Sequence, residues 1–229
     1  MNQPRTTDWD RYYRRPFLAA TLTRSYTGQV LLGAARAHLP RVGGHGLVIA
    51  ELGGANSCFY GLLTREIKPR AYHIIDPHQP GLNMLWRRRA PGVETVLHQV
   101  DILEDLPEIR ADVVISVGLI EHLPPGDLDR AIAAHFRLAA PGGLVLITFP
   151  TPTWLYKAAR LISEALGLWI FHDERPLTPE EVIPHAAARG LVVQTGLIWP
   201  IVFTQALVAI RVPEGGASPG VEGEASGKP

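Results

Sequence analysis

The stretch that decides the fold is LVIAELGGANS, residues 47–57. Its apolar beginning predicts a strand from Leu47 to Leu52, and a run of small residues, Gly53 to Ser57, follows at once. A helix is expected next, from Cys58 to Ile67. A turn of small residues between a strand and a helix lets backbone N–H groups approach a ligand at the carboxyl end of the strand. The same turn would also suit a plain tight connection without a ligand.

Short apolar runs alternate with amphipathic runs after this turn. Further strands are expected at Ala71 to Ile75, Val93 to Val100, Val113 to Val117 and Leu144 to Phe149. A helix is expected from Asp127 to Leu138, with Asp127 able to cap its start. Because the strands are apolar throughout and alternate with helices, the pattern predicts a parallel sheet covered on both faces. The fold class is therefore α/β, doubly wound and Rossmann-like.

One sizeable domain fits the 229 residues and their 46% hydrophobic content. A leading helix is expected from Pro16 to Leu39, so residues 1–44 are predicted to form an N-terminal helical cap on a main domain of residues 45–212. Residues 213–229 contain mainly Gly, Pro, Ser and Glu, which predicts a disordered tail.

Two apolar stretches near the end of the chain need an interpretation. Thr153 to Phe171 predicts a long helix within an insertion at about residues 152–176, and Thr178 begins another helix with capping-box spacing. The insertion suits a lid over an apolar substrate, ordinary core packing or a weak contact with a membrane surface. Leu191 to Ile210 lacks charged residues but is predicted to form two strands and no transmembrane segment.

The charge and cysteine content exclude several classes of function. The 22 basic and 22 acidic side chains cancel, so the chain is not expected to bind nucleic acid. The basic run from Trp86 to Arg89 suits the end of a helix. A single cysteine, Cys58, excludes an internal disulfide, and no Cys and His spacing suits structural zinc. With no signal-peptide pattern at the N-terminus, a cytoplasmic location is expected.

Two carboxylates follow later strands in the same register as the glycine turn. Asp76 ends the second predicted strand, where an acidic side chain can accept hydrogen bonds from a ribose diol. Asp101 follows the third strand, where its carboxylate and the backbone of Ile102 could bind the amino group of adenine. Each carboxylate alone could be a solvated loop residue or a helix cap. Together with the turn they favour a nucleoside pocket.

These motifs, taken in order, resemble those of class I S-adenosylmethionine-dependent methyltransferases, small-molecule type, related to quinone-biosynthesis methyltransferases. The resemblance covers about residues 45 to 150 and depends on these segments: Glu51 to Ser57, Asp76, Val100-Asp101-Ile102, Ser116 to Leu123, and Ala140 to Leu144. It implies a seven-stranded sheet whose last strand runs antiparallel. It also implies that S-adenosylmethionine is the cofactor.

The resemblance assigns each motif a part of the cofactor. The turn would hold the methionyl part, Asp76 the ribose, and Asp101 with Ile102 the adenine. Val117 and Gly118 would line the floor beside the sulfonium. The residues of the turn expected to bind the cofactor are Glu51, Gly53, Gly54 and Ala55. Tyr12 and Tyr13 would fold over the cofactor or serve as surface residues.

Two positions depart from the family pattern. Ala55 and Ser57 stand where the family usually has glycine, and alanine tolerates positive φ less well. A non-catalytic S-adenosylmethionine-binding or assembly module is therefore the alternative function. A nicotinamide-dependent oxidoreductase is the nearest enzymatic rival, but it would require glycine in place of Ala55 and Cys58.

The expected function is methyl transfer to an O, N or C atom of a small, partly apolar metabolite. His122 is the first candidate for a base, and His172 and Asp173 rank second. Glu121 would orient His122 or hold a hydroxyl group of the cofactor. A structural role for His122 is the alternative. In quinone-type relatives a Glu-His pair at this place can join a metal site with an earlier glutamate. Gly118 stands at that position, so no metal is expected.

Overall fold

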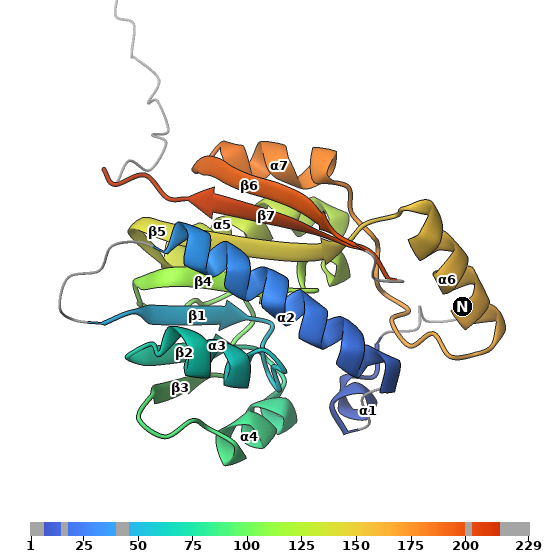
Figure 1. The fold of residues 1–229 in the computed structure, drawn as a ribbon, viewed down its shortest axis with the longest axis horizontal. Helices are drawn as coiled ribbons and strands as arrows, with labels where there is room; N and C mark the ends of the chain where they lie inside the picture. The colour runs from blue at the N-terminus through green and yellow to red at the C-terminus, as the bar shows by residue number, and fades with distance from the viewer. Residues whose placement is uncertain (1–6, 15–17, 40–45, 200–202, 216–229) are drawn as a thin grey trace, which may run out of the picture.

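The computed structural model describes residues 7–14, 18–39, 46–199 and 203–215. Within these ranges the chain forms a seven-stranded sheet of order β3-β2-β1-β4-β5-β7-β6 (Figure 1). The strands are β1 (Val48–Leu52), β2 (Ala71–Ile75), β3 (Glu94–His98), β4 (Ala111–Val117), β5 (Ala139–Pro150), β6 (Leu191–Ile198) and β7 (Gln205–Arg211). Neighbouring strands in the part of the sheet from β3 through β2, β1 and β4 to β5 run parallel. Strand β7 runs antiparallel to both of its neighbours, β5 and β6. The predicted Rossmann-like fold with an antiparallel last strand is confirmed.

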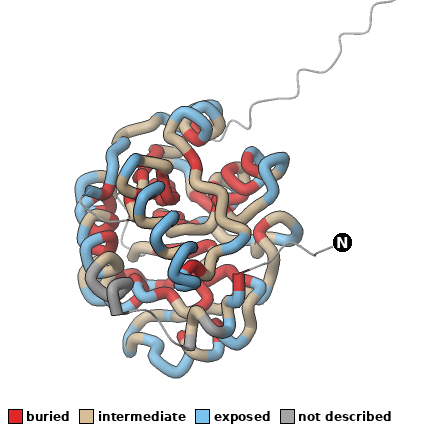
Figure 2. The backbone as a smooth tube through the Cα atoms, turned by 90° about the vertical axis from the view of Figure 1, so that its right-hand side faces the viewer, coloured by how far each residue is buried: buried red, intermediate tan, exposed pale blue. Residues whose placement is uncertain are grey.

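Helices cover both faces of the sheet. On one face α2 (Leu18–His38), α3 (Tyr60–Ile67) and α4 (Gln79–Arg87) pack on side chains such as Ile49. On the other face α5 (Leu128–Leu138) and α7 (Pro179–Ala187) pack on side chains such as Ala50. Because neighbouring residues of β1 point to opposite faces, each strand contributes to both cores. Buried residues lie inside and exposed residues on the outer helix turns (Figure 2).

Four further helical segments complete the described ranges. They are α1 (Trp9–Arg14), α6 (Trp154–Ala165) and the 3₁₀ turns η1 (Ile120–His122) and η2 (Pro125–Asp127). The α6 helix lies beyond the end of β5, to one side of the sheet (Figure 1). The α1 and η1 segments both lie near the carboxyl ends of the parallel strands, where they contribute to the site described below.

The strand predictions agree with the structure apart from their ends. β2 has the predicted bounds, and β5 begins at Ala139, earlier than the expected Leu144. The stretch from 191 to 210 forms β6 and β7 on either side of residues 200–202, which the structure does not describe. Within the described ranges, every helix is too short or too polar to cross a membrane.

Two helix predictions were wrong in detail. The helix expected from Thr153 to Phe171 ends at Ala165, because Gly167 adopts a positive φ of 65° and turns the chain. Asp127 sits at the start of α5 but makes no capping hydrogen bond. Its carboxylate instead pairs with Arg130 at 2.6 Å.

The capping box predicted for α7 is confirmed. The Thr178 side chain accepts from the backbone at the third helical position, and Thr178 N donates to Glu181 Oε2 at 2.9 Å. The predicted division of the chain into cap, main domain and tail stays a prediction. Residues 216–229 of the predicted tail lie outside the described ranges.

Candidate active site

The carboxyl ends of the parallel strands border a cavity of about 510 Å³. Most of the predicted site residues line it: Glu51, Gly53, Asp76, Asp101, Ile102, Val117, Gly118 and His122. Three predicted residues do not reach its wall, namely Gly54, Ala55 and Glu121. The topology therefore gathers residues from four separate motifs at one crevice, where ligands bind in open α/β sheets.

Glycine is required at the two positions of the turn after β1. Gly53 has a φ of 70°, and a Cβ there would lie 2.9 Å from Leu119 Cδ1. A Cβ on Gly54 would lie 2.8 Å from the Glu51 side chain. Gly53 N is already used, because it donates to the carbonyl of Ile75 at 2.9 Å. The turn thus brings bare backbone to the cavity while remaining tied to β2.

Ala55 and Ser57, which depart from the family pattern, lie differently: Ala55 does not line the cavity, whereas Ser57 does. The Ala55 methyl is fully buried and does not form part of the cavity wall. The backbone φ of Ala55 is not positive, so alanine is not strained at this position. Ser57 Oγ accepts from Phe59 N at 3.1 Å and from Tyr60 N at 3.3 Å, so its side chain supports the start of α3.

Asp76 lines the cavity and holds the two turns beside it together. Its Oδ2 accepts from Ala55 N at 3.0 Å and its Oδ1 from His78 N at 2.7 Å. Burial raises the pKa of Asp76, and the two backbone N–H groups oppose that rise. Each carboxylate oxygen can accept a further hydrogen bond, so the side chain remains able to bind a diol.

Glu51 lies at the bottom of the first turn and is 2% exposed. Tyr72 OH donates to its Oε2 at 2.7 Å. Burial raises the pKa of Glu51 to about 7. A carboxyl group with that pKa can exist in either protonation state near neutral pH, which adds a titratable group to the cavity.

Asp101 and Ile102 line the cavity beyond β3, as predicted. Asp101 Oδ1 accepts from Leu103 N at 2.9 Å, which fixes the carboxylate relative to its own loop. Ile102 is buried, with 5% exposure, and contributes an apolar surface next to that carboxylate. An apolar surface beside a polar group suits the flat, hydrogen-bonding edge of a base.

The other end of the cavity is formed by the segment after β4. Gly118 has a φ of 65° and donates from its N–H to the Thr148 carbonyl at 3.0 Å. His122 Nδ1 lies 3.3 Å from Asp173 Oδ1. Burial lowers the pKa of His122, and the nearby Asp173 carboxylate opposes that effect. The second-rank candidate Asp173 is thus brought to His122, whereas His172 does not line the cavity.

Glu121 is buried behind His122 with 2% exposure. Burial is the first cause of a strongly raised pKa at Glu121, and Glu174 and Asp173 add to the rise. Its Oε1 lies 4.0 Å from His122 Nε2. Glu121 does not line the cavity, and its carboxyl group lies on the Nε2 side of the His122 ring.

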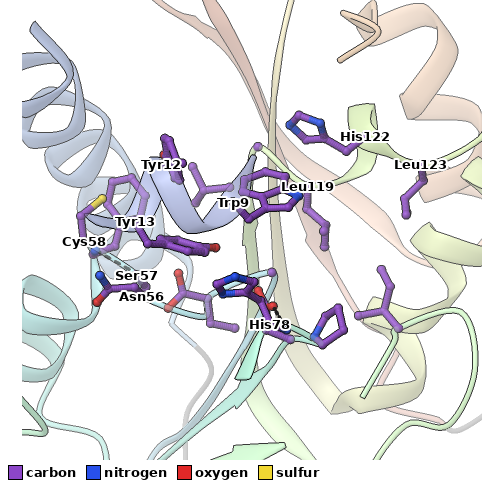
Figure 3. Close-up of a pocket in the computed structure, with 18 of the residues that line it drawn as sticks. Trp9, Tyr12, Tyr13, Asn56, Ser57, Cys58, His78, Leu119, His122 and Leu123 are labelled. Atoms are coloured by element: carbon purple, nitrogen blue, oxygen red, sulfur yellow. Dashed lines mark hydrogen bonds between the residues drawn. The ribbon is translucent and has the colours of Figure 1, made fainter. Parts of the chain in front are cut away.

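The N-terminal helix α1 covers the cavity between its two ends. Trp9 contacts the His122 ring at a centroid distance of 5.0 Å, and Tyr13 contacts the His78 ring at 5.2 Å. In Figure 3 the Trp9 ring lies between His78 and His122, and the Tyr13 ring lies next to His78. Tyr12 and Tyr13 both line the cavity, and their fold over a cofactor stays a prediction.

Several further lining residues were missed by the sequence interpretation, among them one tryptophan and two arginines. Trp9 and Arg24 line the cavity from the N-terminal helices, and Arg88 lines it from the end of α4. Arg88 donates to Asn56 Oδ1 at 2.9 Å and also contacts the Ser57 carbonyl, so it has a structural role beyond the helix end. The only sequence signal for Trp9 is its place beside Tyr12 and Tyr13 at helical spacing.

Comparisons with known proteins agree with this architecture. Residues 51–147 match a family model described as a methyltransferase domain. A comparison with curated protein sequences found no match. The match begins within β1 and includes the turn, Asp76, Asp101 and the η1 segment, so it covers the cavity residues that follow the parallel strands. The lining residues from α1 and α2, and Asp173, lie outside it.

Solved structures share the fold at low sequence identity. Magnesium protoporphyrin IX methyltransferase from Synechocystis PCC 6803, with bound SAH, is 13% identical with a TM-score of 0.69, over 89% of this chain and 92% of that chain. N-methyltransferase NodS from Bradyrhizobium japonicum WM9 is 17% identical with a TM-score of 0.64, over 86% of this chain and 100% of that chain. Residues 51–147 therefore match a methyltransferase domain model, and the chain shares the class I fold of these methyltransferase structures.

Proposed function

We propose that the chain transfers the methyl group of S-adenosylmethionine to an O, N or C atom of a small, partly apolar metabolite. The observation that carries the proposal is the convergence of Gly53, Asp76, Asp101 and Gly118 on one cavity of about 510 Å³. Solved neighbours of the same fold hold S-adenosylhomocysteine or S-adenosylmethionine. A cytoplasmic location stays a prediction.

The residues at the cavity would have two roles: some would contact the cofactor, and others would support the turn after β1. Backbone at Gly53 would receive the methionyl part, Asp76 the ribose hydroxyls, and Asp101 with Ile102 the adenine. Arg24 lines the same cavity and carries a positive charge suited to the methionyl carboxylate. Glu51, Gly54 and Ala55 would support the turn, because the Glu51 carboxylate already accepts a hydrogen bond from Tyr72 and the other two residues do not line the cavity.

S-adenosylmethionine supplies an already activated methyl group, so the protein has to align the acceptor and exclude water. The ring of Trp9 beside His122 provides an apolar cover at the acceptor end. Leu119 and Leu123 line the same end. These contacts would favour an acceptor with an apolar part and would hold it against the floor at Val117 and Gly118.

His122 can activate the acceptor in two ways. With Nδ1–H donated to Asp173, its Nε2 has a free lone pair that can take a proton from an O–H or N–H group. The same lone pair can bind a cation that makes the acceptor more acidic. Glu121 lies on the Nε2 side and would assist either process.

The experiment that tests the function measures binding first and turnover second. Isothermal titration of the full chain with S-adenosylhomocysteine should show one binding site. A folded protein that shows no binding of either form of the cofactor at millimolar concentration would contradict the proposal. Turnover is then followed as S-adenosylhomocysteine formed with phenolic, amine and fatty-acyl acceptors, and binding without turnover across these acceptors would support the non-catalytic alternative.

A further inference from the structure

Three potential metal ligands come together behind the acceptor end of the cavity. Glu121, His122 and Glu174 each offer one ligand atom, and these atoms lie within 4.8 Å of one another. The first two residues belong to η1 after β4, whereas Glu174 comes from the segment between α6 and α7. The fold therefore brings in the Glu174 carboxylate as a third ligand. It replaces the glutamate that quinone-type relatives have at the position of Gly118.

Glu121 provides independent evidence for a ligand at this place. Its side chain is 2% exposed, and within the described part of the chain its Oε2 is buried with no hydrogen-bond partner. An orphaned carboxylate oxygen in the interior is costly, so such groups are normally paired or coordinate a metal. A Cβ on Gly118 would lie 3.2 Å from Glu121 Oε1, which places this carboxylate directly beneath the cavity floor.

His122 is oriented as metal-binding histidines usually are. Its Nδ1 lies 3.3 Å from Asp173 Oδ1, and its Nε2 lies 4.0 Å from Glu121 Oε1. A histidine that donates one ring N–H to a carboxylate has the other nitrogen free for a metal, and the carboxylate fixes the plane of the ring. Asp173 thus serves as the orienting partner, and Nε2 points towards the remaining ligands.

Glu174 completes the set without being neutralised by its neighbours. Tyr156 OH donates to Glu174 Oε1, and Arg160 Nη1 reaches the Glu174 carbonyl at 3.2 Å. The Arg160 guanidinium also pairs with Glu164 at 2.8 Å. Arg160 thus contacts the Glu174 backbone, Tyr156 and Glu164 rather than the Glu174 carboxylate, so the carboxylates around His122 keep a need for positive charge.

We propose that Glu121, His122 and Glu174 bind one divalent transition-metal cation, with Asp173 holding His122 in place. One imidazole nitrogen with two carboxylates suits Mn²⁺, Fe²⁺ or Zn²⁺ better than Ca²⁺, which prefers an all-oxygen site with more ligands. This proposal corrects the expectation from sequence that Gly118 leaves the site without enough ligands.

The consequence for the substrate rests on the proposed function. A cation beneath Gly118 lies beside the floor where the methyl group would be transferred. It can bind an oxygen atom and lower the pKa of a hydroxyl group. The acceptor class is therefore a compound with a hydroxyl group, attached to an apolar body that fits against Trp9 and Leu123.

The test is a titration of the metal-free full chain with Mn²⁺, followed by electron paramagnetic resonance of the free ion and by calorimetry. Wild-type protein should bind one Mn²⁺. Glu174→Gln and Glu121→Gln should each raise the Kd for Mn²⁺ by at least about tenfold, and Asp173→Asn by about tenfold through the histidine. Glu180→Gln, at an exposed glutamate of α7, is the matched control and should bind as the wild type does.

Circular dichroism of each variant checks the fold, and Glu174→Gln alone suffices if Glu121→Gln fails to fold. The proposal is overturned if the wild type binds no Mn²⁺ at millimolar concentration, or if folded Glu174→Gln binds as tightly as the wild type. Binding of S-adenosylhomocysteine is measured in parallel without metal. If the chain binds S-adenosylhomocysteine but not Mn²⁺, only the proposed cation site is contradicted. If it binds Mn²⁺ but not S-adenosylhomocysteine, only the proposed methyltransferase function is contradicted.

Discussion

The methyl group of Ala55 fills the space that Gly81 leaves open. A Cβ on Gly81 would lie 2.7 Å from Ala55 Cβ, closer than two non-bonded carbon atoms can approach. Ala55 belongs to the turn after β1 and Gly81 to the first turn of α4, so the substitution in one motif is matched by a glycine in another. The departure from the family pattern at Ala55 is thus accommodated away from the cavity.

This relationship predicts a coupled effect on stability. Gly81→Ala should lower the free energy of unfolding by about 1–3 kcal/mol, because the new methyl overlaps Ala55 and the His78 ring. Adding Ala55→Gly should recover part of that loss. Urea unfolding of the two single variants and the double variant measures the coupling. Strictly additive losses would show that the two side chains do not share this space.

Asp76 is expected to control cofactor affinity. Asp76→Ala removes the acceptor for the ribose hydroxyls and also frees Ala55 N and His78 N. The Kd for S-adenosylhomocysteine should rise by about 10- to 100-fold, equivalent to about 1.4–2.8 kcal/mol. Asp105→Ala, at an exposed position in the loop after β3, is the control. An unchanged Kd in folded Asp76→Ala would remove the ribose assignment.

The parallel sheet was predictable because its central strands, β1, β4 and β5, are apolar enough to be buried on both faces. Gly53, Asp76, Asp101 and Gly118 were predictable for a related reason. Each lies at or shortly after the end of a parallel strand, so the topology brings these residues to one edge of the sheet.

The contributions of Trp9, Arg24, Asp173 and Glu174 were harder to predict. They come from α1, from α2 and from the segment after α6, whose positions depend on tertiary packing rather than on a strand end. The break at Gly167 shows the same limit, because helical spacing of apolar residues continues past a glycine that turns the chain. Asp173 could be ranked only as a second candidate until its contact with His122 was seen.

Glu51 should make stability depend on pH. Its pKa is raised from 4.5 to about 7 in the folded protein, so its contribution to stability is fully present below the unfolded pKa and is lost as pH rises through the folded pKa. Glu51→Gln has no titratable group at this position, so its stability does not decrease in this way as the pH rises. Relative to wild type, the variant should therefore gain about 2–3 kcal/mol of unfolding free energy between roughly pH 5 and pH 8.

Urea unfolding of wild type and Glu51→Gln at both pH values measures this difference. Glu108→Gln, an exposed glutamate, serves as a control and should show no such pH-dependent gain. A constant difference between Glu51→Gln and wild type at the two pH values would mean that Glu51 is not the titrating group.

Arg24 should bind the methionyl carboxylate of the cofactor. Its guanidinium lies 5.1 Å from the Tyr12 ring centroid, at the cavity wall. Arg24→Met should raise the Kd for S-adenosylhomocysteine about tenfold or more, because charge-assisted hydrogen bonds to a carboxylate would be lost. The Kd for adenosine, which has no carboxylate, should not change. Equal losses for both ligands would indicate that Arg24 shapes the cavity rather than recognising the carboxylate.

The outer side of α6 should add little to the stability of the fold. Leu161 is 68% exposed and Ile162 is 59% exposed, whereas Leu146 in β5 is fully buried. Replacing both exposed residues with Gln should change the free energy of unfolding by less than about 0.5 kcal/mol each, while Leu146→Ala should cost about 2–5 kcal/mol. Cosedimentation with liposomes tests the membrane-surface interpretation with the same variants. If wild type binds liposomes and the double Gln variant does not, the exposed apolar face is a lipid contact; equal behaviour of the two proteins removes that interpretation and leaves the lid.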